Sequence, residues 1–334
     1  NDVAGVQLVL AGARERIDAL LERVRDAAPA GARIESLRVR ERSGDGDVAR
    51  GAGFRITSGR SAAGNLRTRL PPDAPICEPC LEELFEPANR RHRYAFTHCA
   101  TCGPRASVLH APPWDRARTT LAAFEPCAAC RAEYDDPGDR RFHAESIACP
   151  ACGPQLFARD AAGNALAGDP VEQAAVALAR GEIVALKAYG GWHLAVLAKN
   201  EAAVARLRAR KRRPKKPFAL LVPDAASACA LAEIDGAARD ALALRLRAIV
   251  LAPRREARCA ELGLAAGVAP GLQDLGLLLP VAPLHHLLLY APQARPGIDA
   301  PRFAALVLTS ANRSGEPTLA DDAEALVQLA GIAD

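Results

Sequence analysis

The sequence predicts a multidomain protein of mixed α+β and α/β class, in which a metal-binding module separates two folded units. The length of 334 residues is the first indication, because a single hydrophobic core rarely extends much beyond ~250 residues. The second is that eight of the ten cysteines form four Cys-x-x-Cys pairs within one segment. The third is the alternation of buried-type strands with helices after that segment, which is typical of an α/β sheet domain.

Composition and charge argue against several classes of protein, namely dedicated nucleic-acid-binding, membrane-spanning and secreted proteins. Half of the residues are apolar and 25% are charged, as in an ordinary soluble protein. The formal charge of +4 is too small for a dedicated nucleic-acid-binding protein. No apolar run reaches the ~20 residues of a membrane helix, and the first residues do not resemble a signal peptide. Because the chain begins at Asn1, ends at Asp334 and contains no methionine, we expect it to be a fragment.

The first unit, residues 1–58, combines strand and helix patterns. Its helix is predicted because apolar residues recur on one face at helical spacing. The predicted elements are the strand Val6–Leu10, the helix Ala13–Ala28 and the strands Ile34–Val39 and Gly53–Thr57. A linker that contains Pro71-Pro72 is predicted over residues 59–75.

The second and third units differ sharply in composition. Residues 76–155 hold the paired cysteines and few apolar runs, so metal rather than a core is expected to organise them. A second linker is predicted over residues 156–168, and the α/β unit over residues 169–334. Its predicted elements are the helices Pro170–Arg180 and Glu201–Arg210 and the strands Glu182–Ala188, Phe218–Val222, Ala248–Leu251 and Ala305–Leu308.

The cysteine segment is an internal repeat of 50 residues. Eighteen residues separate the first two pairs, 24 the middle ones and 18 the last two. A shift of 50 residues superimposes the cysteines of one repeat on those of the other, and with them Glu83 on Glu133, Arg90 on Arg140, Arg91 on Arg141 and Gly103 on Gly153. The pairs are Cys77/Cys80, Cys99/Cys102, Cys127/Cys130 and Cys149/Cys152.

This spacing predicts two structural Zn²⁺ ions. Two residues between cysteines form a short knuckle that directs both sulfurs at one metal, and two Cys₄ tetrahedra leave no open coordination position. Sequential pairing, with one ion per repeat, fits the duplication, but crossed pairing of the first pair with the fourth gives the same ligand count. The same cysteines fit disulfides or an iron–sulfur cluster less well. Because free thiolates are needed to bind zinc, we expect the protein to be located in the reducing cytoplasm. Cys229 and Cys259 stand apart and are expected to be packing residues.

Polar and basic residues follow predicted strands of the α/β unit. The segment Lys187–His193 follows one strand and is expected to bend into a helix, at a strand end where α/β sheets usually bind ligands. The basic run Lys211–Pro217 is either a solvated helix end, with cations near the negative end of the dipole, or a phosphate site. Thr309–Asn312 directly follows the buried strand Ala305–Leu308.

Three stretches, together with the cysteine spacings, carry a family resemblance: Cys99–Arg105, Trp114–Thr120 and Asp139–Ala144. They resemble the carbamoyltransferase HypF family of NiFe-hydrogenase maturation. The resemblance runs the length of the chain and covers roughly the first half of a full-length member. It implies that the first unit is the end of a ferredoxin-like acylphosphatase domain, the second a double zinc-finger module and the third a truncated YrdC-like domain with a twisted mixed sheet.

The resemblance implies roles for individual residues. Asn1 falls on the acylphosphatase asparagine that orients the attacking water, although the arginine-bearing phosphate loop would lie upstream. In YrdC-like domains a Lys-x-Arg and a Ser-x-Asn motif share the nucleotide site. The matching residues here are Lys211 and Arg213, Ser310 and Asn312, with Lys187 as a further cation.

One more loop shows the resemblance less closely. Leu279–His286 lies where the family usually has Tyr-Thr in place of Val281-Ala282. The roles of His285 and His286 therefore stay open, because a histidine at an apolar helix start is more often a packing or capping residue.

The implied reaction uses carbamoyl phosphate, and ATP with Mg²⁺, to form a carbamoyl-adenylate whose carbamoyl group passes to the C-terminal cysteine of HypE. The alternatives are a YrdC-type zinc-finger protein that binds RNA and a tRNA-modifying enzyme that forms threonylcarbamoyl-adenylate. Aromatic residues make up only 4% of the chain and few lie near the basic run, so stacking platforms for single strands are missing. Neither nucleic acid nor a membrane is therefore the expected partner.

Overall fold

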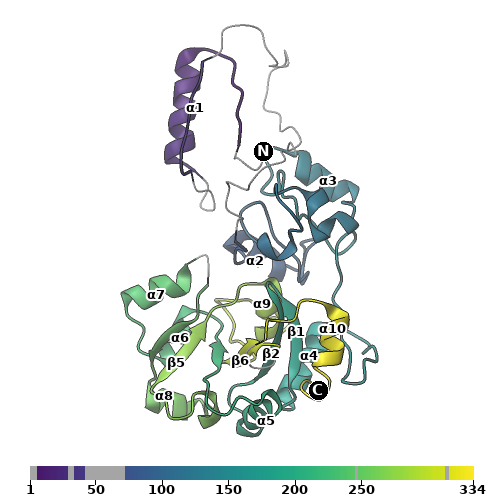
Figure 1. The fold of residues 1–334 in the computed structure, drawn as a ribbon, viewed down its shortest axis with the longest axis vertical. Helices are drawn as coiled ribbons and strands as arrows, with labels where there is room; N and C mark the ends of the chain where they lie inside the picture. Colours follow the sequence, from purple (N-terminus) through teal and green to yellow (C-terminus); the bar gives the residue numbers. More distant parts are fainter. Residues whose placement is uncertain (1–5, 29–33, 42–71, 245–246, 313–315) are drawn as a thin grey trace.

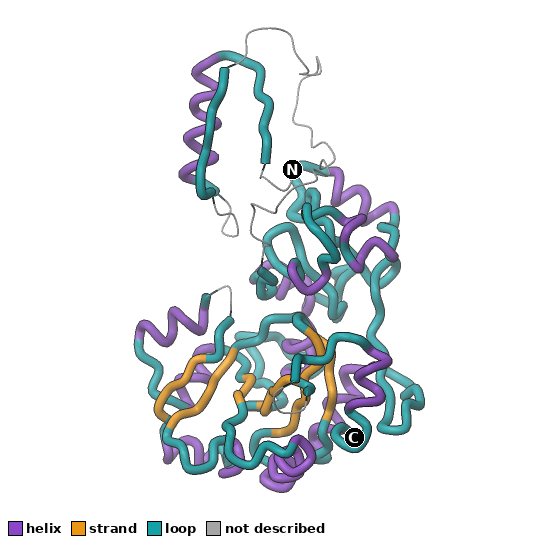
Figure 2. The backbone as a smooth tube through the Cα atoms, viewed as in Figure 1, coloured by secondary structure: helices purple, strands orange, loops and turns teal. Residues whose placement is uncertain are grey.

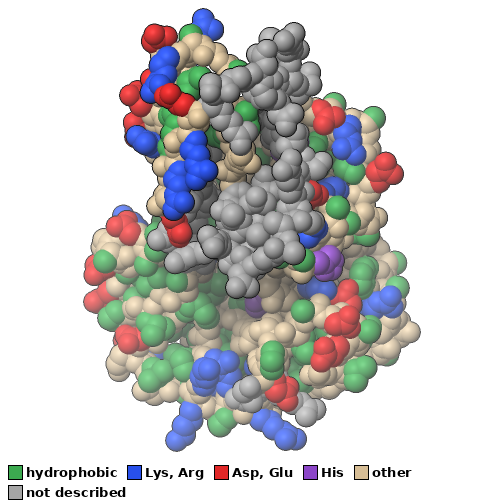
Figure 3. Space-filling model, turned by 45° about the horizontal axis from the view of Figure 1, so that its top comes forward, with side chains coloured by type: hydrophobic (Ala, Val, Ile, Leu, Met, Phe, Trp, Pro, Cys, Tyr) green, Lys and Arg blue, Asp and Glu red, His purple; other side chains and the backbone are tan. Residues whose placement is uncertain are grey.

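The computed structural model describes residues 6–28, 34–41, 72–244, 247–312 and 316–334. Helix α1 (Arg14–Asp26) lies at one end of the molecule, the cysteine module (residues 76–155) in the middle and a sheet covered by helices at the other end (Figure 1). Basic and acidic side chains are interspersed on the face shown in Figure 3, consistent with the small net charge. Within the described ranges, no helix combines the length and apolarity that a membrane crossing requires.

Helix α1 confirms the helix predicted over Ala13–Ala28, and none of its residues is buried. The strands predicted over Val6–Leu10 and Ile34–Val39 are wrong, because both segments are irregular. A strand requires a hydrogen-bonded neighbour, which an alternating sequence pattern does not by itself provide. The predicted strand Gly53–Thr57 and the candidate residue Asn1 lie outside the described residues.

The cysteine module contains two short helices at equivalent places in the repeat, α2 (Glu78–Phe85) and α3 (Ala128–Asp135). Each begins directly after the first cysteine of its repeat. Three 3₁₀ turns lie between them: η1 (Ala106–Val108), η2 (Arg116–Arg118) and η3 (Thr120–Ala123). The apolar cluster of the second repeat has four buried residues, two of which are cysteines, so the sulfur sites must supply much of the order of this region.

A mixed sheet, whose strands are orange in Figure 2, forms the core of the third unit. It has six strands in the order β1-β2-β6-β3-β5-β4. Only β3 and β5 pair in parallel, and the other neighbours are antiparallel. The mixed sheet predicted from the sequence is thereby confirmed. The strands are β1 (Val184–Ala188), β2 (Gly191–Leu197), β3 (Ala219–Leu221), β4 (Val250–Pro253), β5 (Asp274–Leu278) and β6 (Leu306–Ser310).

Helices cover both faces of this sheet because its strands alternate apolar side chains between two cores. Leu194 and Val196 of β2 belong to one core, which includes Leu207 of α5. Ala195 and Leu197 belong to the other, which includes residues of α4, α9 and the first cysteine repeat. The helices are α4 (Pro170–Ala179), α5 (Glu201–Lys211), α6 (Ala225–Leu231), α7 (Gly236–Ala243), α8 (Glu256–Glu261), η4 (Ala266–Val268), α9 (Pro283–Leu289) and α10 (Asp322–Gln328).

Most predicted elements of this unit agree with the structure. The predicted helices correspond to α4 and α5, and three of the predicted strands correspond to β1, β3 and β6 within two residues at each end. The strand predicted over Ala248–Leu251 is β4, displaced by two residues to Val250–Pro253. The fourth residue of β4 is a proline, which lies at an edge of the sheet where its missing N–H costs no ladder bond.

The prediction that Lys187–His193 bends into a helix is wrong. Ala188 pairs with Gly191, so β1 and β2 form a hairpin with a two-residue turn. Gly190 has a φ of 82° and Gly191 one of 121°, conformations that other residues rarely adopt. A Cβ on Gly191 would also lie 2.4 Å from the Leu319 carbonyl oxygen. The two glycines therefore serve a tight turn and a close backbone approach.

Candidate metal centres and strand-end site

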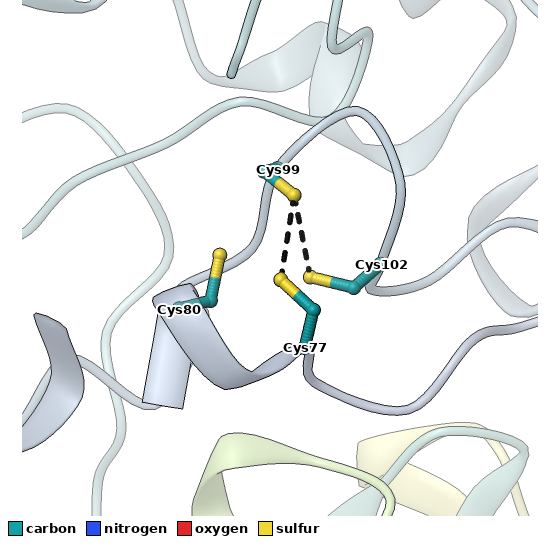
Figure 4. A group of neighbouring side chains, drawn as sticks. All are labelled: Cys77, Cys80, Cys99 and Cys102. Carbon is teal, nitrogen blue, oxygen red and sulfur yellow. Dashed lines mark hydrogen bonds between the residues drawn. The ribbon is translucent and has the colours of Figure 1, made fainter. Parts of the chain in front are cut away.

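The first cysteine cluster joins the two Cys-x-x-Cys pairs of the first repeat (Figure 4). Cys77 is the N-cap of α2 and Cys80 lies in its first turn, so the helix start sets the spacing of these two sulfurs. Cys99 and Cys102 come from a loop opposite the helix. The Sγ atom of Cys99 lies 3.7 Å from that of Cys77 and 3.7 Å from that of Cys102.

The second cluster repeats this geometry. Cys127 caps α3, Cys130 lies in its first turn, and Cys149 and Cys152 come from the opposite loop. The sulfur of Cys149 is 3.8 Å from that of Cys127 and 3.6 Å from that of Cys152. Each residue of both clusters offers one sulfur, and the four sulfurs of a cluster lie within 4.8 Å of one another.

These distances fit zinc. A Zn–S bond of ~2.3 Å in a tetrahedron places the sulfurs ~3.8 Å apart. A disulfide would require a separation of ~2.05 Å. Four thiolates close the coordination sphere, so the two clusters fit two structural zinc sites. The pairing is sequential, with one site per repeat, and the crossed alternative is wrong.

A glycine follows the last cysteine of each repeat for a steric reason. At Gly103, where φ is 93°, a Cβ would lie 2.5 Å from the Cβ of His98. At Gly153 it would lie 2.1 Å from the Tyr94 hydroxyl. Neither site has space for a side chain, which explains why glycine occupies both positions of the repeat.

Arginines from each repeat contact the sulfur cluster of the other. Arg90 donates to the sulfur of Cys130 at 3.2 Å, and Arg140 donates to the sulfur of Cys80 at 3.2 Å. The next arginines, Arg91 and Arg141, are buried and ion-paired with Glu133 and Glu83 respectively. The sequence contained the signal for these contacts, since the four arginines and two glutamates coincide in the repeat, but their exchange between repeats was not predicted.

The carboxylates of these contacts stay ionised. Burial alone would raise the pKa of Glu133, but hydrogen bonds from Arg91 and Arg90 outweigh it and lower that pKa to about 2. The pKa of Glu83 is lowered in the same way, against the effect of burial, by Arg141 and Arg140. Both ion pairs are therefore charged at neutral pH.

At the sheet, four of the five predicted strand-end residues meet. The Lys211 ammonium, at the end of α5, donates to the main-chain oxygens of Ser310 and Asn312, each at 2.7 Å. The hydroxyl of Ser310 donates to the Asn312 side-chain oxygen at 2.6 Å. Arg213 donates to the hydroxyl of Thr309 at 3.2 Å. Two segments about a hundred residues apart thus form one polar cluster at the end of β6.

Burial changes the chemistry of this lysine. Lys211 is only 4% exposed. Desolvation, with the charges of Arg213 and Lys216 nearby, lowers the pKa of Lys211 to about 8. The guanidinium of Arg213 lies over the ring of Phe218, with its carbon 5.0 Å from the ring centroid, and donates to the main-chain oxygen of Lys216 at 3.2 Å. The cluster is therefore cationic and held in place by its own loops.

Lys187 is the predicted residue that the structure keeps apart from this cluster. It pairs with Trp192 in the β1–β2 hairpin, and the carbonyl of Trp192 accepts a hydrogen bond from Ala311. Two strand spacings, or ~10 Å, therefore separate its backbone from β6. Its ammonium forms an ion pair with Asp322 of α10 at 2.6 Å.

The two histidines of α9 are buried. His285 accepts a hydrogen bond from the Val281 N–H at its Nδ1, at 3.3 Å, and desolvation lowers the pKa of each histidine to about 3. Val281 also accepts a hydrogen bond from the N–H of Ile76 at 3.0 Å, which joins this loop to the cysteine module. In the described part of the chain, Nε2 of His285 and Nδ1 of His286 have no hydrogen-bond partner.

Comparisons with known proteins agree with both parts of this geometry. Residues 76–109 and 127–158 match the family described as HypF finger, and residues 176–334 match the family described as Telomere recombination, which takes its label from Sua5, YciO and YrdC. Over its whole length the chain is 45% identical to carbamoyltransferase HypF2 of Cupriavidus necator and 46% identical to carbamoyltransferase HypF of Rhodobacter capsulatus.

Solved structures show the same similarity. A crystal structure of full-length HypF in a phosphate- and nucleotide-bound form matches with a TM-score of 0.84 and 38% identity over 97% of this chain. The crystal structure of HypF from T. kodakarensis matches with a TM-score of 0.83 and 36% identity over 99% of the chain. The chain spans about two fifths of the length of these relatives, 41% and 42% of the two proteins above and 40% of each structure.

Proposed function

The chain belongs to the HypF family, and we propose that it forms part of a carbamoyltransferase of NiFe-hydrogenase maturation. In this proposal water hydrolyses carbamoyl phosphate to carbamate and phosphate. A carbamate oxygen then attacks the α-phosphorus of ATP, and the bond from that phosphorus to the bridging oxygen breaks. Carbamoyl-adenylate and pyrophosphate result. A further domain passes the carbamoyl group to the C-terminal cysteine of HypE, in the cytoplasm, and AMP is released.

The polar cluster at the end of β6 is the observation that carries this proposal. It combines the positive charges of Lys211 and Arg213 with the hydrogen-bonding side chains of Ser310 and Asn312. Fixed cations stabilise the charge that develops on phosphate oxygens in an adenylation transition state. A matching HypF structure is described as binding phosphate and nucleotide.

Each residue of the cluster has a different role in the proposed site. Because Lys211 contacts two main-chain oxygens of the Ser-Ala-Asn turn, it orients that turn and adds a positive charge to the site. Arg213, which is half-buried and donates to Thr309, would contact the phosphates of Mg²⁺-bound ATP. Ser310 and Asn312 would then exchange their mutual hydrogen bond for one to a phosphate or carbamate oxygen.

Pyrophosphate exchange tests the proposal. The full-length protein is incubated with MgATP, labelled pyrophosphate and carbamoyl phosphate. We expect label to enter ATP only when carbamoyl phosphate is present. Parallel reactions with threonine and bicarbonate test the threonylcarbamoyl-adenylate alternative, and exchange in those reactions alone would refute the carbamoyl assignment. Absence of exchange in every reaction would refute adenylation at this site.

A further inference from the structure

The two cysteine repeats exchange the residues that surround their sulfur clusters. Arg140 belongs to the second repeat but donates to Cys80 of the first, and Arg90 belongs to the first repeat but donates to Cys130 of the second. Both N–H···S distances are 3.2 Å. The relation is reciprocal and follows the 50-residue shift of the sequence repeat.

Each crossing arginine is held by a carboxylate of the repeat that it enters. Glu133 lies three residues after Cys130 on α3, on the same helix face, and accepts from Arg90 at 3.1 Å. Glu83 lies three residues after Cys80 on α2 and accepts from Arg140 at 2.5 Å. One helix therefore presents both a sulfur and a carboxylate to the partner repeat's guanidinium.

The neighbouring arginines support the cysteine loops. Arg91 is 1% exposed and donates to the main-chain oxygen of Ala148, the residue before Cys149, at 2.9 Å. Arg141 is 3% exposed and donates to the main-chain oxygen of His98, the residue before Cys99, at 3.0 Å. The second pair of sulfurs in each repeat is thus positioned by a buried arginine of the other repeat.

Charge explains why these contacts matter for a metal. Zinc with four thiolates carries a net charge of about −2, which is costly to hold in a partly buried site without cations. N–H···S hydrogen bonds disperse that charge and orient the sulfurs. Mutation of residues that contact metal ligands in this way typically weakens metal binding by ~10–100-fold. Each site of this module depends for such contacts on a loop that the other site orders.

We infer that the two zinc sites are coupled, so that metal bound in either repeat tightens binding in the other. Zinc in the first repeat fixes α2 and the loop that carries Arg90 and Arg91, which the second site uses. Zinc in the second repeat fixes Arg140 and Arg141 for the first site. Loss of either ion then weakens binding of the other, which makes the module one cooperative unit rather than two independent fingers.

Crossed variants test this inference in the full-length protein. ¹¹³Cd is substituted for zinc, and the two resonances are assigned with single Cys→Ser variants. Arg140→Gln should weaken metal binding ~10–100-fold at the Cys77–Cys102 site first, and Arg90→Gln at the Cys127–Cys152 site first. Arg140→Lys, which keeps a cation, should restore part of the loss. Arg131→Gln is the matched control, because Arg131 follows Cys130 directly but lies over the ring of Tyr134.

A second experiment measures the coupling directly. Cys127→Ser combined with Cys149→Ser removes the second site, and zinc affinity at the intact first site is measured by competition with a chelator. We expect a loss of at least tenfold relative to the wild-type protein. An unchanged affinity at that site would overturn the inference. So would crossed variants that lose metal first from the mutated residue's own repeat, or retain it like the wild type.

Discussion

Lys211 and Asn312 are joined by two contacts: the lysine ammonium donates to the main-chain oxygen of Asn312 at 2.7 Å and lies 3.4 Å from its side-chain oxygen. A third contact joins the same ammonium to the oxygen of Ser310. The end of α5 therefore fixes the turn that follows β6. A residue from the basic run determines the geometry of the Ser-x-Asn motif before any ligand binds.

Replacing Lys211 should abolish adenylation. Lys211→Ala removes a charge near the developing charge of the transition state and leaves two partly buried carbonyl oxygens without their donor. We expect pyrophosphate exchange to fall by a factor of ~10²–10³ and the free energy of unfolding to fall by ~1–3 kcal/mol. Exchange is measured in the full-length protein, and unfolding by urea titration.

The neighbouring Lys215 provides the control for this variant. It is exposed within the same basic run, so Lys215→Ala should keep most of the exchange activity and the wild-type stability. If Lys211→Ala folds and exchanges at the wild-type rate, the nucleotide site lies elsewhere. Equal losses in both variants would indicate a diffuse electrostatic effect instead of a defined site.

Nucleotide affinity should depend on pH through Lys211. Since the pKa of this lysine is lowered to about 8, it is charged at pH 7 and largely neutral at pH 9. The charged form favours ATP, so affinity is full below the lowered pKa and is lost as pH rises through it. The dissociation constant for MgATP should increase roughly tenfold between pH 7 and pH 9. Titration calorimetry measures it, and Lys211→Arg should give a flat profile because arginine stays charged.

Glu172 should determine how firmly the cysteine module docks on the sheet. Its carboxylate accepts from Arg93 of the module at 2.8 Å and from Arg302 at 2.9 and 2.8 Å. Glu172→Gln leaves the largely buried guanidinium of Arg302 without its counter-ion and leaves Arg93 with only Asp169, 3.4 Å away. The free energy of unfolding should fall by ~1–3 kcal/mol. Glu233→Gln, at an exposed carboxylate, is the control. Equal unfolding midpoints for the two variants would show that Glu172 makes no net contribution.

The sequence predicted those features that depend on local pattern. The cysteine spacing predicted both metal sites, and apolar periodicity predicted α4, α5, β1, β3 and β6, because these residues bury the same faces that their pattern marks. The strands expected over Val6–Leu10 and Ile34–Val39 failed, since pairing requires partners that a pattern does not identify. The helix expected after Lys187 failed because two glycines turn the chain straight back into β2.

Long-range contacts were the least predictable part. The repeat marked Arg90, Arg140, Glu83 and Glu133 as equivalent, but only the three-dimensional arrangement shows that they act across the repeat boundary. In the same way, the motifs predicted that Lys211 and Asn312 share a site, while the direct contact between them depends on where α5 ends relative to β6. The ion pair of Lys187 with Asp322 had no signal in the sequence.

Purified protein should contain two zinc ions per chain, because each cluster supplies four sulfurs at tetrahedral spacing. Structural zinc sites of this kind contribute ~10–16 kcal/mol of binding free energy that becomes folding free energy. A chelator should therefore unfold residues 76–155, which bury few apolar side chains around the second site. Metal content is measured by elemental analysis of protein prepared anaerobically, and unfolding by limited proteolysis.

Cys229→Ser is the control, since Cys229 lies outside both clusters and should leave the zinc content unchanged. Cys80→Ser should lower it by at least one ion. A content of one ion or none in the wild-type protein, or resistance of the module to proteolysis after complete zinc removal, would contradict the two structural sites.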